Sequence, residues 1–198
     1  AASLVRAATD LLDDGNERSS LRVRLAALDL RNGVDVAVEA IARLVPASRK
    51  SPAAGRVRPD RRLRIMQVIL SSGFAGSERA AAEACNALCG RHDVLLIVRS
   101  DHRSAGGASI RDHLDAEVQV IEVPGVLGTR RRIAEAIHSW QPDVIHTHLR
   151  RGTRYVAQIG AGPVHFCTLH LSLNGPHYLR SDGTFCISEW QLATVPAT

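Results

Sequence analysis

Short apolar runs of strand length alternate with helix-like segments from residue 63 to the end of the chain. The first run, LRIMQVIL, is continuous and rich in β-branched residues, as expected for a strand that is covered on both faces. Five further runs follow it, DVLLIV, EVQVIEV, PDVIHTH, VHFCTLH and GTFCIS, and helical patterns such as SERAAAEACNALCG and RRRIAEAIHSW lie between them. Repeated βα units of this kind predict an α/β fold, a Rossmann-like parallel sheet with helices on both faces.

Composition divides the 198 residues into three zones. Residues 1–45 carry two short patterns with apolar side chains at helical spacing, so they predict an N-terminal helical segment. Residues 46–62, PASRKSPAAGRVRPDRR, contain three prolines and many arginines without periodicity, which indicates a basic, Pro-rich linker. The predicted α/β domain occupies residues 63–198.

The net charge of +5 is concentrated in two places, residues 49–64 and residues 130–132. Such basic runs attract phosphates or anionic lipid headgroups, although most of them are solvated linkers or surface faces. Aromatic residues make up only 4% of the chain, whereas nucleic-acid surfaces interleave basic and aromatic residues. We therefore expect no nucleic acid partner.

The chain contains neither the pattern of a signal peptide nor the roughly 18 consecutive apolar residues of a membrane span. Its four cysteines form no CxxC pair and are expected to be reduced and buried. These features predict a cytoplasmic protein. Because the sequence does not begin with methionine, we expect it to be a piece of a longer chain.

The loop after the first apolar run, SSGFAGSER, precedes a predicted helix. In open parallel sheets, ligands bind beyond the carboxyl ends of the strands, where this loop lies. Gly73 and Gly76 allow backbone conformations closed to other residues and the close approach of a ligand, and a helix N-terminus favours an anionic group. Glu78 in the first helical turn also fits simple capping with Ser77. The pattern is neither GxGxxG nor GxxxxGK[ST], so it gives little support to a dinucleotide site or a P-loop.

Histidines end two of the predicted strands. His146 and His148 share one face of a strand, but no third ligand accompanies them, so we expect no metal. His170 follows the fifth run, where an imidazole could accept a proton or bind a sugar hydroxyl. The segment RRGTR, with Arg150, Arg151 and Arg154, offers donors for a phosphate or a carboxylate, or is a solvated helix start.

Four segments resemble, in order and spacing, the N-terminal domain of glycosyltransferase family 4, a retaining family with the GT-B fold. They are RIMQVILSSGFAGSERAAAEACNAL, QPDVIHTHLRRG, TLHLSLNG and FCISEWQ. The segment LVRAATDLLDDGNERSSL is similar to the helical C-terminal tail of the same family. The order of tail, linker and head implies a junction between two fused units or a fragment of such a chain, and a permuted arrangement is the alternative.

The resemblance implies roles for individual residues. In this family the N-terminal domain holds the acceptor, and the C-terminal domain holds the nucleotide sugar. His170 would be the catalytic residue beside the reacting sugar. Gly73, Gly76 and Glu78 would form the loop near the donor diphosphate or the acceptor. His148, Arg150 and Asn174 would line the acceptor side. The resemblance implies no metal and no cofactor besides the nucleotide sugar, which is a substrate.

The predicted function is therefore the acceptor side of a glycosyltransferase, half of a GT-B fold, which moves a sugar from a nucleotide-sugar donor to a glycan or lipid-linked acceptor of a bacterial envelope. A donor domain is expected in a longer chain, and this chain alone is expected to be inactive. The basic stretch 49–64 would suit peripheral contact with the inner face of a membrane. The alternatives are a non-catalytic Rossmann-like binding or scaffold module, and an oxidoreductase, which the missing GxGxxG argues against.

Overall fold

The computed structural model describes residues 62–103, 107–160, 162–173 and 175–195. All of them belong to one compact unit of the chain. The predicted helical segment 1–45, nearly all of the linker 46–62 and the candidate residue Asn174 lie outside the described residues.

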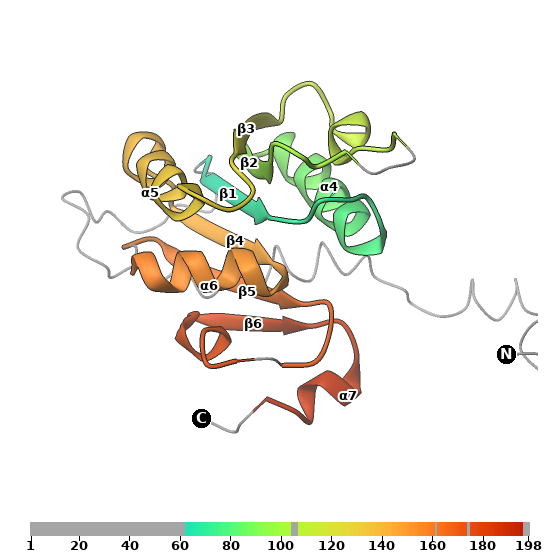
Figure 1. The fold of residues 1–198 in the computed structure, drawn as a ribbon, viewed down its shortest axis with the longest axis vertical. Helices are drawn as coiled ribbons and strands as arrows, with labels where there is room; N and C mark the ends of the chain where they lie inside the picture. Colours follow the sequence, from blue (N-terminus) through green and yellow to red (C-terminus); the bar gives the residue numbers. More distant parts are fainter. Residues whose placement is uncertain (1–61, 104–106, 161, 174, 196–198) are drawn as a thin grey trace, which may run out of the picture. The chain divides into compact units, whose positions relative to one another are not determined.

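The described strands form one parallel sheet in the order β3-β2-β1-β4-β5-β6, as Figure 1 shows. They are β1 (Arg64–Ile69), β2 (Asp93–Arg99), β3 (Gln119–Val123), β4 (Val144–His148), β5 (Val164–Leu169) and β6 (Gly183–Cys186). This is the doubly wound order. From β1 the chain adds β2 and β3 on one side, and then returns to add β4, β5 and β6 on the other side. The predicted α/β, Rossmann-like parallel sheet is thereby confirmed, and its switch point lies between these two strands.

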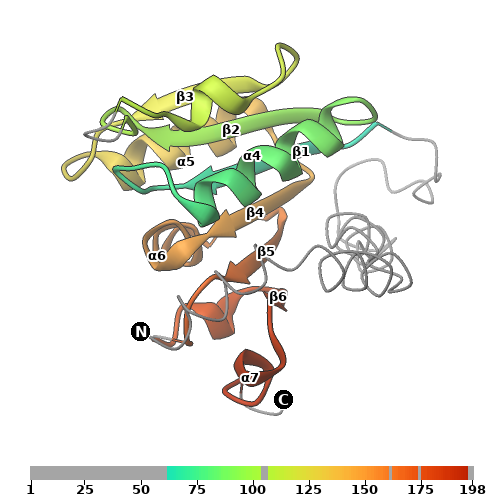
Figure 2. The same ribbon diagram turned by 90° about the vertical axis from the view of Figure 1, so that its right-hand side faces the viewer.

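Helices cover both faces of this sheet (Figures 1 and 2). One face carries α4 (Gly76–Cys89), and the other carries α5 (Thr129–Trp140) and α6 (Leu149–Ile159). The shorter helices are η1 (Ile110–His113), η2 (Tyr178–Arg180) and α7 (Glu189–Leu192).

Two helix ends differ in detail from the sequence pattern. The apolar pattern predicts a helix from Thr153, but α6 begins four residues earlier because Leu149, with φ 63°, turns the chain directly out of β4. Gly90 does cap α4, but it is right-handed, with φ −63°, so that helix ends without a left-handed glycine. A left-handed glycine instead ends α6 at Gly160, with φ 66°.

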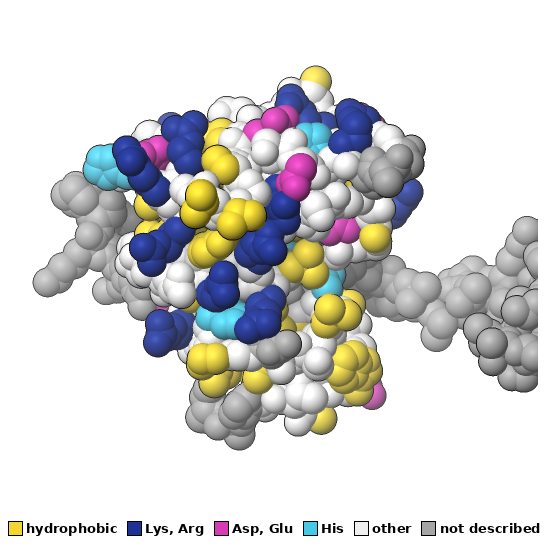
Figure 3. All heavy atoms as spheres, in the orientation of Figure 1, with side chains coloured by type: hydrophobic (Ala, Val, Ile, Leu, Met, Phe, Trp, Pro, Cys, Tyr) yellow, Lys and Arg dark blue, Asp and Glu magenta, His cyan; other side chains and the backbone are white. Residues whose placement is uncertain are grey.

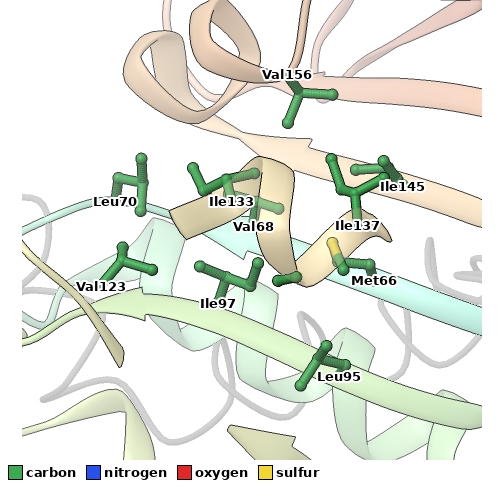
Figure 4. Close-up of a cluster of buried hydrophobic side chains, with 11 residues drawn as sticks. Met66, Val68, Leu70, Leu95, Ile97, Val123, Ile133, Ile137, Ile145 and Val156 are labelled. Carbon is green, nitrogen blue, oxygen red and sulfur yellow. The ribbon is translucent and has the colours of Figure 1, made fainter. Parts of the chain in front are cut away.

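A cluster of buried side chains lies between the sheet and the pair α5 and α6 (Figure 4). Strand residues Met66, Val68, Leu95, Ile97 and Ile145 meet Ile133, Ile137 and Val156 of the two helices. Gly152 lets α6 approach β1 closely, since a Cβ at this position would lie 3.2 Å from the carbonyl oxygen of Val68. Alternation along a strand therefore sends Gln67 to the opposite face, which α4 covers.

Across the described ranges, no helix is both long enough and apolar enough to cross a membrane.

Candidate functional site

A row of three hydrogen-bonded side chains runs from β1 across the end of β4 to the end of β5. Gln67 Oε1 lies 2.9 Å from His148 Nε2, and His148 Nδ1 lies 3.0 Å from His170 Nε2. Gln67 is 0% exposed and His148 is 2% exposed, whereas His170 is half-buried. The row therefore starts in the core of the sheet and ends near solvent, beyond the carboxyl ends of the strands at the switch point.

Burial keeps both imidazoles of the row neutral near pH 7. It lowers the pKa of His148 well below the usual range, and the nearby His146 and His170 lower it further. Burial also lowers the pKa of His170, while the charge of Glu78 raises it. Each ring therefore carries a single N–H.

Because each ring has only one N–H, the donors and acceptors of the two rings depend on the orientation of the Gln67 amide. If Gln67 Oε1 accepts from His148 Nε2–H, the N–H of His170 Nε2 donates to His148 Nδ1. His170 Nδ1 is then a free acceptor. An amide turned by 180° would donate to His148 and would reverse every donor in the row. The orientation of Gln67 thus decides whether His170 presents a base or a donor to a ligand.

His146 supports the row from the side. Its ring lies 4.3 Å from that of His148, and its Nε2 lies 2.7 Å from Thr168 Oγ1. Burial lowers the pKa of His146 to about 3, so this ring is neutral as well. The two histidines of the HxH pattern do share a face, as alternation along the strand requires. Within the described part of the chain, no group of three His, Cys, Asp or Glu side chains is placed to hold a metal ion.

The loop after β1 leads into α4 through an acidic cap. Glu78 is buried, its Oε2 accepts from Ala75 N at 2.9 Å, and its Oε1 accepts from Ser77 Oγ at 3.0 Å. Simple capping by Glu78 is therefore present, with Ala75 at the N-cap position. The same carboxylate acts on the pKa of His170, so loop and row meet at one place.

Gly73 and Gly76 do not adopt the conformations closed to other residues that the sequence suggested. Neither has a positive φ, and a Cβ at either position would meet no atom within 4 Å. That expectation was wrong, because an ordinary turn suffices to join β1 to α4. The space beside the backbone at both glycines is open.

Arg150 lies apart from the row, although only one residue separates it from His148. Leu149, with its left-handed φ of 63°, redirects the chain, and Arg150 is exposed in the first turn of α6. Its charge acts on the pKa values of His177 and Tyr178. The structure thus brings together His148, His170 and Glu78 and places Arg150 beside η2.

Comparison with known proteins decides the family. The family model described as "Glycosyltransferase Family 4" matches residues 74–193, which is more than half of the chain. The chain belongs to glycosyltransferase family 4. The matched residues include the last two residues of the loop before α4, the end of β4 and the end of β5, so His148 and His170 lie inside the family match and Gln67 lies outside it.

Among solved structures, the chain is similar to a glycosyltransferase from Rickettsia africae ESF-5, known as a crystal structure. It shares 22% sequence identity with a TM-score of 0.45, over 58% of this chain and 31% of its own chain. This family 4 chain thus spans less than a third of that relative's length. No curated protein matches the chain.

Sequence reasoning missed Gln67 as a member of the site of this family 4 chain. The available signal was a single amide within the otherwise apolar run LRIMQVIL, since a polar side chain in a central strand needs a partner. It also missed a second polar cluster, on the α6 face of the sheet. There Thr147 Oγ1 lies 2.9 Å from Thr153 Oγ1 and 3.0 Å from His165 Nε2.

Proposed function

We propose that this family 4 domain forms the acceptor side of a glycosyltransferase cleft, which moves a sugar from a nucleotide sugar to a glycan or lipid-linked acceptor. The observation that carries the proposal is the row Gln67, His148 and His170, which ends at the switch point of the sheet beside the loop before α4. Sugar hydroxyls need directed donors and acceptors, and a row with fixed tautomers provides them.

In this proposal His170 is the catalytic residue that touches the sugar. It is the half-buried end of the row, and its outer nitrogen can bind a hydroxyl or accept its proton. His148 and Gln67 are positioning residues, because both are buried behind it. The open backbone at Gly73 and Gly76 offers N–H groups to an oxygen of the acceptor or of the donor diphosphate.

Transfer with retention would depend on positioning and on stabilising the departing diphosphate. The proposal therefore includes a donor domain in a longer chain, no cofactor besides the nucleotide sugar, and no activity of this domain alone. Peripheral membrane contact through the basic stretch 49–64 is a further part of it. Of that stretch, the described Arg62 pairs with Asp93, and Arg64 lies over the ring of Trp140, so these two arginines are engaged within the domain.

The test is a transfer assay with a panel of nucleotide sugars, in which this chain is compared with the longer open reading frame that contains it. We expect activity only in the longer form, and a loss of about a hundredfold on His170→Ala. His138→Ala is the matched control, since His138 is an exposed histidine on α5, away from the row. Inactivity of every form, with the fold intact by circular dichroism, would instead favour the binding or scaffold module.

A further inference from the structure

Three arginines gather around His177 where η2 meets α6. Arg150 and Arg154 are four residues apart on α6 and therefore share a face of that helix. Arg180 is the last residue of η2, which packs against α6. The charges of all three act on the His177 ring, whose pKa is lowered first by burial and then by these guanidinium groups. The three side chains are exposed, so a ligand can reach them from solvent.

The positive charge of this cluster is not balanced by neighbouring carboxylates. Six other arginines of the described segments have an acidic partner: Arg62 with Asp93, Arg99 with Asp101, Arg103 with Asp112, Arg111 with Glu122, and Arg131 and Arg132 with Glu135. Within those same segments, neither Arg150 nor Arg154 nor Arg180 forms an ion pair, and Arg154 instead lies 5.2 Å from the ring centre of Tyr155. Figure 3 shows basic side chains gathered on this face around a histidine.

His177 gives a second, independent sign of a missing partner. It is 8% exposed, yet its Nε2 has no hydrogen-bond partner. The ring fills the space beside Gly175, where a Cβ would lie 2.5 Å from its Cε1, and it packs on the Tyr178 ring with the ring centres 4.8 Å apart. Buried ring nitrogens are normally satisfied by protein, water or a ligand, so this nitrogen is open to a partner that protein groups do not supply.

This cluster is separate from the row of Gln67, His148 and His170. Tyr178 packs with Cys167 and Leu169 of β5. These two residues alternate with Thr168, which bonds His146 on the face of the row. The arginine cluster therefore lies on the α6 face of the sheet, and the row lies on the α4 face.

We propose that Arg150, Arg154 and Arg180 bind an oxyanion, a phosphate group, beside His177. Planar guanidinium groups bind phosphate oxygens in pairs, and several of them can match a doubly charged monoester or a diester. For the biological identity of the ligand, the proposal rests on the proposed function: the phosphate would be that of a lipid-linked acceptor or of a free phosphorylated sugar. The anion site itself can be tested without any transfer activity.

The first experiment titrates inorganic phosphate into the whole chain and follows the histidine signals by NMR. We expect saturable binding with a rise in the pKa of His177, because a bound anion offsets the three positive charges. The double variant Arg150→Gln with Arg180→Gln should bind phosphate at least ten times more weakly, and Arg154→Gln should also weaken it. Arg91→Gln is the matched control, an exposed arginine before β2, a strand that lies on the opposite side of β1 from β4 and β5. Equal titrations for wild type and the folded double variant would overturn the proposal.

A second experiment separates the two sources of phosphate. Vesicles of phosphatidylcholine with and without phosphatidylglycerol are compared with a soluble sugar phosphate. Binding to the phosphatidylglycerol vesicles that is lost in the double variant would identify a lipid headgroup. Arginine-dependent binding of the sugar phosphate alone would identify a free ligand. If phosphate binds but the longer chain transfers no sugar, the proposed function fails while the anion site stands.

Discussion

His148 Nδ1 and His170 Nε2 lie 3.0 Å apart across neighbouring parallel strands, and burial holds both rings neutral. The sheet register explains this approach, because His148 is paired with Thr168 and His170 follows two residues later on the same face. Two neutral imidazoles in contact can share only one N–H between them. The tautomer of His170, the outer ring, therefore depends on the buried amide of Gln67.

Replacing Gln67 should change the tautomer of His170, although the two side chains are linked only through His148. Gln67→Leu removes the partner of His148 Nε2, so neither tautomer of the row is favoured. We expect the imidazole nitrogen signals of His170 in 15N NMR to shift toward a mixture of tautomers. In the longer chain, transfer should fall about tenfold, which is less than the roughly hundredfold or more of a lost acid or base, because the His170 imidazole itself remains.

Met66→Leu is the control for Gln67→Leu, because Met66 is the buried neighbour on the opposite face and a swap of similar volume costs less than about 1.5 kcal/mol. Unchanged His170 signals in a folded Gln67→Leu variant would show that the amide does not govern the row.

Removing the charge of Glu78 should lower the pKa of His170 further. The carboxylate raises that pKa against the effect of burial, so Glu78→Gln leaves burial unopposed. The amide oxygen of glutamine can still accept from Ala75 N, which preserves the helix cap. A 1H NMR titration of the His170 ring measures the change, with Glu83→Gln on the exposed side of α4 as the control. A rise in the pKa, or an equal fall in both variants, would contradict the proximity of Glu78.

Much of this fold was predictable, because each strand is marked by an apolar run of neighbouring residues in the sequence. A parallel sheet covered on both faces demands continuous apolar runs, and each predicted run became a strand. His170 and the HxH pair were selected as candidates by the rule that ligands bind beyond the strand ends, and the structure brings them together. Gln67 was not found, since its partner is 81 residues away and depends on β1 lying beside β4. Arg150 was grouped with His148 by the family resemblance, but a single left-handed residue, Leu149, separates them.

Acid should destabilise the domain through its buried histidines. Burial lowers the pKa of His146 to about 3 and that of His165 to about 4, from an ordinary value of about 6.5 in the unfolded chain. Between these values the unfolded state binds more protons, so the free energy of unfolding falls as the pH falls from about 6.5 toward about 4. At pH 5 the loss should be about 2 kcal/mol for each buried histidine relative to pH 7.5.

Urea unfolding at pH 7.5 and pH 5 measures this loss. His165→Gln keeps a hydrogen-bonding group near Thr147 but cannot titrate, so its stability should depend less steeply on pH than that of the wild type. A pH dependence identical to wild type would show that His165 is protonated equally in both states.

Adding one methyl group at Gly152 should loosen the packing of α6 on β1. Alanine favours a helix over glycine by about 1 kcal/mol, but here its Cβ would lie 3.2 Å from the carbonyl oxygen of Val68, in the central strand. The strand is hydrogen-bonded on both sides and cannot retreat, so the clash should exceed the helix gain. We expect Gly152→Ala to lower the free energy of unfolding by about 1–2 kcal/mol in urea titrations. Gly90→Ala is the matched control, since its backbone is right-handed with open space around it, and it should be neutral or slightly stabilising. Equal stability of the two variants would contradict this prediction. It would mean that α6 can move away from β1 without cost, together with the turn at Leu149 where α6 begins.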